Sequence, residues 1–147
     1  MPEIIFDADF PSVVRSEMER LLNDTVWLCP IWLQKLFIGF GSQADDPDAA
    51  ARFILQKDYR WARLQVTMDF FTSDNPREML IHELVHAFTI PLKTCANDAF
   101  QDLGLDQKLY DVLFRQLDKS MEQVTQDFAF VIEKRLQCDL LSNKQVQ

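Results

Sequence analysis

The sequence predicts an α+β fold in which one helix precedes a small sheet and further helices follow it. Apolar residues recur at helical spacing near both ends of the chain, and a stretch that alternates with a period of two lies between them. The chain has 147 residues, of which 48% are hydrophobic and 26% charged. This size and balance are typical of one globular domain, so we predict a single domain over residues 1–147.

The first elements are a helix and a strand joined by an apolar connector. Helical spacing predicts the helix over about residues 11–23, with Pro11 in the first turn, where a missing N–H costs little. Residues 27–33 are aromatic and apolar, which favours a packed connector. The strand that follows is predicted from Lys35 to Phe40.

The rest of the predicted sheet lies between an acidic loop and the next helix. The loop is expected at residues 45–48, because the sequence there is Asp-Asp-Pro-Asp. A strand is predicted over about residues 53–59, and a second one from Leu64 to Phe71, where apolar and polar residues alternate. We therefore expect a small twisted sheet of about three strands, mainly antiparallel.

The next helix has clear start and stop residues. Asn75 can cap it, Pro76 suits its first position, and Glu78 can reach back to the cap. Proline lacks the N–H that a helix interior needs, so Pro91 predicts an end near Ile90.

Two C-terminal helices are predicted after a looser segment at residues 93–104. Their apolar stripes extend over about residues 106–117 and 120–141.

Charge, hydropathy and cysteine usage exclude several classes of protein. The net charge of −8 opposes nucleic-acid binding, and no apolar run reaches the ~18 residues that span a membrane. The first residues are acidic and lack a secretory signal, which predicts a cytoplasmic location. Cys29, Cys95 and Cys138 are an odd number at wide spacing, so reduced thiols are expected rather than a disulfide framework.

The sequence His82-Glu83-Leu84-Val85-His86 is an HExxH motif inside a predicted helix. Residues four apart lie on one helix face, so the two imidazoles can bind one Zn²⁺ ion. Glu83 lies about 100° around the axis, where it can reach a water molecule without being a ligand. With only two histidines in the chain, this arrangement arises by chance less than roughly once in a thousand sequences.

The third metal ligand has several candidates. A catalytic zinc usually has three protein ligands and an open position, and no third histidine exists. Glu122 is preferred because it lies beside the apolar stripe of the last helix, where a carboxylate without a cation is costly. Glu133 falls on nearly the same face and is the second candidate. Cys95 is the least favoured.

The motif, followed by Glu122 on a later helix, resembles the gluzincin branch of the zincin metallopeptidases, and more closely the small HExxH proteins of phage and prophage type. The resemblance covers about residues 31–135. It implies a backing helix, a small twisted sheet, the zinc helix and a C-terminal ligand helix. It also implies His82, His86 and Glu122 as ligands and Glu83 as the general base.

Three further features of a gluzincin site have less distinct counterparts in this sequence: the residue after the ligand glutamate, the oxyanion-stabilising group and the peptide-binding strand. Gluzincins often have a small or acidic residue four positions after the ligand glutamate, and here this residue is Gln126. Tyr110 and Arg135 are candidates to stabilise an oxyanion, although structural roles explain both more simply. The resemblance also implies that an extended peptide could pair with the strand from Leu64 to Phe71. A sheet edge covered by another segment explains that strand equally well.

The leading hypothesis is a zinc metallopeptidase in which water attacks a peptide carbonyl with Glu83 as general base. The alternative is a non-catalytic or latent zincin-fold protein that keeps the zinc site for binding or assembly. An intact Glu83 favours the enzyme, because a structural zinc site has no need of a carboxylate beside its ligands.

Overall fold

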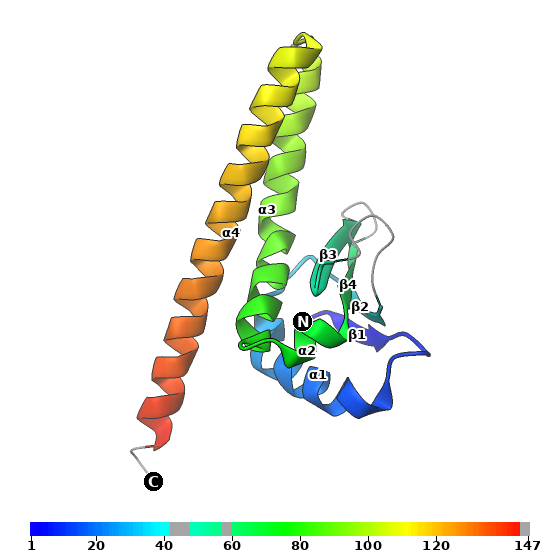
Figure 1. Cartoon of the computed structure of the whole chain (residues 1–147), viewed down its shortest axis with the longest axis vertical. Coiled ribbons are helices and arrows are strands. Elements are labelled where there is room, and N and C mark those ends of the chain that lie inside the picture. The colour runs from blue at the N-terminus through cyan, green and yellow to red at the C-terminus, as the bar shows by residue number, and fades with distance from the viewer. Residues whose placement is uncertain (42–47, 57–59, 145–147) are drawn as a thin grey trace.

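The computed structural model describes residues 1–41, 48–56 and 60–144, with the backbone alone from residue 139 onward. It has an α+β architecture in which a small sheet lies beside two long antiparallel helices (Figure 1). The elements in chain order are β1 (Glu3–Phe6), α1 (Ser12–Thr25), a 3₁₀ turn η1 (Val26–Leu28), β2 (Lys35–Phe40), β3 (Ala51–Gln56), β4 (Trp61–Val66), α2 (Met68–Thr72), α3 (Pro76–Asp102) and α4 (Gln107–Lys144). The predicted first helix and the predicted strand from Lys35 to Phe40 are confirmed.

The sheet is mixed, with the strand order β1-β2-β4-β3. β1 pairs with β2 and β2 with β4 in parallel, and only β3 and β4 are antiparallel. The prediction of a mainly antiparallel sheet is therefore wrong. The alternation of side chains shows which residues face the core, but it does not specify the direction of the neighbouring strand. β1, which was not predicted, adds one of the two parallel pairs.

The core lies between one face of the sheet and the helices α1 and α3. Side chains on β2 and β4 that point to this face are fully buried, as are the apolar faces of the two helices. This packing fixes the position of α3 against the sheet. The fully buried residues include Met18, Leu21, Leu36, Ile38, Leu64, Val66, Phe70, Leu80, Ile81 and Leu84.

The boundaries of the last two strands differ from those predicted. β3 begins at Ala51, two residues earlier than expected, and residues 45–47 and 57–59 of the predicted loop and strand lie outside the described residues. The strand predicted to reach Phe71 ends at Val66. The backbone N–H and the hydroxyl of Thr67 both donate to the carbonyl of Ala50, at 2.9 and 3.2 Å, and α2 then buries Phe70.

Helix α3 is longer than the sequence predicts. Its start is confirmed, because the Asn75 side chain accepts a hydrogen bond from the backbone N–H of Glu78 at 3.3 Å. The predicted end near Ile90 is wrong, since the helix continues through Pro91 to Asp102. An interior proline costs about 3 kcal/mol. Packing of the extended helix against α4 offsets this cost, because tertiary contacts outweigh local propensity.

Helix α4 is one continuous element where two helices were predicted. The segment between the two apolar stripes is polar, but residues 105–144 contain neither glycine nor proline, so nothing interrupts the hydrogen bonds. Gly104 with φ of +61° ends α3, and the Asp106 carboxylate accepts from the N–H of Leu109 to begin α4. The two helices form a long hairpin that extends past the sheet (Figure 1).

Among the described residues, no helix combines the length and the apolar character needed to cross a membrane.

Candidate metal centre

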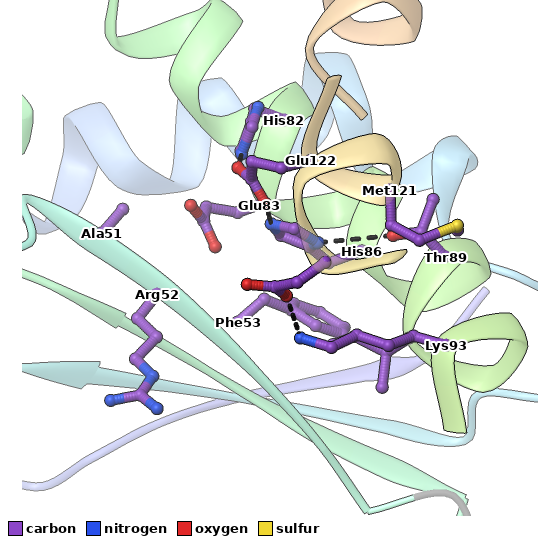
Figure 2. Close-up of a pocket in the computed structure, with 12 residues that line it drawn as sticks. Ala51, Arg52, Phe53, His82, Glu83, His86, Thr89, Lys93, Met121 and Glu122 are labelled. Atoms are coloured by element: carbon purple, nitrogen blue, oxygen red, sulfur yellow. Dashed lines mark hydrogen bonds and ion pairs between the residues drawn. The ribbon is translucent and has the colours of Figure 1, made fainter. Parts of the chain in front are cut away.

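The antiparallel packing of α3 and α4 brings the predicted ligand residues together. His82 and His86 lie one turn apart on α3, and Glu122 reaches them from α4 (Figure 2). The Nε2 atom of His82 is 2.9 Å from Oε1 of Glu122, and that of His86 is 3.8 Å from Oε2. One ligand atom from each residue lies within 4.8 Å of the other two. The predicted grouping of these three side chains is thus observed.

The donor set fits a zinc ion. A tetrahedral zinc with bonds near 2.0–2.1 Å separates its ligand atoms by roughly 3.3 Å, and the two measured distances lie on either side of this value. Two imidazole nitrogens and one carboxylate are a frequent catalytic combination that leaves one position open. The Glu122 side chain is 59% exposed, so it can shift by a few tenths of an ångström to complete such a set.

The two histidines differ in what their second ring nitrogens contact. Nδ1 of His86 lies 3.3 Å from the hydroxyl of Thr89. Nδ1 of His82 is buried and has no hydrogen-bond partner among the described residues. Burial lowers the pKa of His86, and the Glu122 carboxylate opposes this effect while the neighbouring His82 adds to it. Burial therefore favours the neutral imidazole, which is the form that binds metals.

Glu83 is buried beside this group without belonging to it. Figure 2 shows its side chain extending from α3 toward β3. The pKa of Glu83 is raised to about 7, mainly by burial. A hydrogen bond from the Phe53 backbone and the Arg52 charge oppose this rise, and the Glu122 charge contributes to it. A nearby cation would lower this pKa and favour the carboxylate form that can accept a proton.

A pocket of about 390 Å³ opens onto the three candidate ligand residues. A second pocket of about 470 Å³ shares Ala51, His82 and Glu83 with the first, so the two pockets adjoin at these residues. The described sheet has β3 at one edge, whereas β4 pairs with β2 on one side and β3 on the other. Of the two explanations left open for the strand from Leu64 to Phe71, the structure therefore favours the covered edge, because β3 pairs with β4 on the side away from β2.

The other candidate site residues lie elsewhere. Glu133 makes two hydrogen bonds with Arg77, at 2.8 and 2.6 Å, so its carboxylate stabilises the helix pair instead of joining the group. Cys95 is exposed and outside the group. The hydroxyl of Tyr110 donates to Asn97 at 2.5 Å near the far end of the hairpin. Arg135 is on α4 about 20 Å further along the helix axis than Glu122, at 1.5 Å per residue.

Several pocket residues were not predicted from the sequence. Arg52 lines the first pocket from β3, and Lys93 forms an ion pair with Asp118 at its rim. Thr89 lines this pocket and is buried beside His86, and Thr125 of α4 is buried against Thr89. The sequence held a signal for both threonines, because each follows a candidate ligand residue by three positions and so lies on the same face of its helix.

Comparison of the chain with protein-family models, with curated proteins and with solved structures found no match.

Proposed function

We propose that the protein is a zinc-dependent metallopeptidase with a zincin-like arrangement of its site. The observation that carries the proposal is the convergence of His82, His86 and Glu122 on one point, with the buried Glu83 beside it in the same pocket. Buried carboxylates with strongly raised pKa values are concentrated at functional sites. A structural zinc site usually has four protein ligands and no such neighbour.

Each of the four side chains has a distinct role in this proposal. His82, His86 and Glu122 would hold Zn²⁺, which when bound supplies Lewis acidity toward a peptide carbonyl and makes water a stronger acid. Glu83 accepts the proton of the attacking water and can return it to the leaving amine. Its position on α3, directly after one ligand, places it on the face that borders the pocket.

An extended peptide is the substrate that this groove suits best. β3 is an edge strand in the described sheet, and backbone groups on its outer side can pair with a peptide. Ala51 and Phe53 of β3 line the pocket opposite Glu83. Backbone pairing binds many sequences, so side-chain preferences would arise from the two ends of the groove.

Metal analysis of the purified protein tests the ligand set. We expect about one zinc ion per chain and its loss in Glu122→Gln, whereas Glu83→Gln should keep it. Zinc bound equally by wild type and Glu122→Gln would contradict the proposed ligand set.

Cleavage of an unstructured protein such as casein tests the chemistry. Glu83→Gln keeps the shape of the side chain and removes the base, so we expect cleavage to fall by about 10²–10⁴-fold. Equal cleavage by wild type and Glu83→Gln would exclude this mechanism for that substrate.

The second candidate function is a zincin-type binding or assembly protein that keeps the metal and is latent or has no turnover. It is favoured by the arrangement of two possible oxyanion donors, because Lys93 is paired with Asp118 and Tyr110 lies near the far end of the hairpin, paired with Asn97. Stoichiometric zinc with no cleavage by the wild type would support this candidate over the peptidase.

A further inference from the structure

A chain of hydroxyl groups connects His86 to the backbone of α4. Nδ1 of His86 lies 3.3 Å from Oγ1 of Thr89, which lies 3.2 Å from Oγ1 of Thr125. The Thr125 hydroxyl donates to the carbonyl oxygen of Met121 at 2.9 Å. Both threonines are buried, so the protein supplies the partners of these groups. We call His86 Nδ1, the two hydroxyls and the Met121 carbonyl the hydroxyl chain.

The Met121 end of the hydroxyl chain fixes its direction. A carbonyl oxygen only accepts, so the single proton of the Thr125 hydroxyl is used there. Thr125 must then accept from Thr89, whose own proton is used in turn. Thr89 has only lone pairs left for His86, so Nδ1 must carry a proton and donate it.

The position of this proton determines what His86 presents to the pocket. In a neutral imidazole only one nitrogen carries a proton, so Nε2 keeps its lone pair. That nitrogen faces Oε2 of Glu122 at 3.8 Å, so two acceptors point at each other across a gap that a cation would fill. His82 differs, because its Nε2 lies 2.9 Å from Glu122 and its Nδ1 has no partner among the described residues.

We propose that Thr89 and Thr125 are positioning residues that hold His86 in the Nδ1–H tautomer, with Nε2 ready to bind the metal. The inference rests on the proposed zinc site for its functional meaning. It adds that, among the described residues, His86 is hydrogen-bonded at its Nδ1 atom and His82 is not. The ring of His82 is held at its Nε2 atom by Glu122, at 2.9 Å, and its buried Nδ1 atom has no hydrogen-bond partner among the described residues. Groups that hydrogen-bond to metal ligands in this way commonly change metal affinity about 10–100-fold.

The tautomer can be measured directly in the metal-free protein. The chain has only two histidines, so long-range ¹H–¹⁵N spectra recorded near pH 8, where histidines are ordinarily neutral, contain two imidazoles. A His82→Gln variant assigns the His86 signals. We expect wild-type His86 to be protonated on Nδ1. Protonation on Nε2 would overturn the proposal, whether or not the protein binds zinc.

Paired variants of Thr89 separate the hydroxyl from the shape of the side chain. Thr89→Val keeps the shape and loses the hydroxyl, and Thr89→Ser keeps the hydroxyl. In competition with a zinc chelator, we expect Thr89→Val to bind zinc at least about 10-fold more weakly and Thr89→Ser to stay within about threefold of wild type. If Thr89→Val does not fold, as judged by circular dichroism, Thr125→Val takes its place. That variant acts on His86 only through Thr89.

The results distinguish failure of this inference from failure of the proposed function. A wild type that binds no zinc removes the metallopeptidase, while the tautomer of metal-free His86 still decides the role of the hydroxyl chain. Equal zinc affinity of wild type and a folded Thr89→Val variant overturns the positioning role. Weaker binding by Thr89→Val, with binding restored in Thr89→Ser, supports it.

Discussion

Replacing Glu133 by glutamine should destabilise the protein and leave metal binding intact. The Glu133 carboxylate is 3% exposed and accepts two hydrogen bonds from Arg77, at 2.8 and 2.6 Å. It also accepts one from Gln137 at 2.9 Å. The hydrogen bonds raise the pKa of Arg77, which therefore stays charged in every accessible solution. This pair joins the first turn of α3 to the C-terminal half of α4.

The expected cost follows from the geometry of the pair. Removing one partner of a fully buried ion pair costs about 3–5 kcal/mol, because the other charge is left without compensation. Arg77 is 18% exposed, so water can solvate part of it, and glutamine can still accept one hydrogen bond. We therefore expect Glu133→Gln to lower the free energy of unfolding by about 2–3 kcal/mol, or the melting temperature by roughly 5–10 °C.

Denaturant unfolding in the presence of a chelator measures this cost without a contribution from bound metal. The matched control is Glu122→Gln, the same substitution on the same helix at a side chain that is 59% exposed. It should change the unfolding free energy by less than about 0.5 kcal/mol while abolishing zinc binding. The double variant Arg77→Met/Glu133→Gln should recover about 1 kcal/mol or more, because no unpaired charge remains.

Two outcomes would refute this reasoning. If Glu133→Gln unfolds at the same denaturant concentration as the wild type, the ion pair of Arg77 and Glu133 does not hold the two helices together. Loss of zinc in Glu133→Gln, with zinc retained in Glu122→Gln, would exchange the roles of the two glutamates.

Two further predictions concern Cys29 and Pro91. Burial raises the pKa of the Cys29 thiol to about 12, so iodoacetamide near pH 8 should alkylate the exposed Cys95 in the native protein and modify Cys29 only after unfolding. Mass spectrometry of the digested protein locates the modified cysteines, and equal labelling of Cys29 and Cys95 in the native protein would contradict the prediction. Pro91→Ala supplies an N–H that can bond to the carbonyl of Ala87, so it should stabilise α3 by about 1–2 kcal/mol in denaturant unfolding. A destabilised variant would show that the proline ring makes contacts worth more than the restored hydrogen bond.

Local features of the fold could be predicted because they depend on residues a few positions apart. The strand from Lys35 to Phe40 and the cap at Asn75 are confirmed as predicted. The placement of His82 and His86 on one helix face needs only the helical repeat, and Glu83 is on the pocket side for the same reason. These features depend only on residues within one segment, so the spacing of those residues in the sequence is sufficient to predict them.

Features that depend on neighbours distant in the chain could not be predicted reliably. Pro91 is a strong local stop signal, but contacts with α4 keep the helix intact beyond it. The alternation that ends at Val66 shows which face of β4 is buried. The position of β4 between β2 and β3 depends on how the whole sheet assembles, and so does the identity of the strand at the open edge.

Local sequence patterns were sufficient to identify the two histidines, the adjacent Glu83 and the helix that carries them. They left Glu122 and Glu133 on nearly the same face of one helix, and no local pattern separates their roles. The register of α3 against α4 decided between them, placing one beside the imidazoles and the other against Arg77. That register is set by packing along both helices and against the sheet, so it exists only in the folded chain.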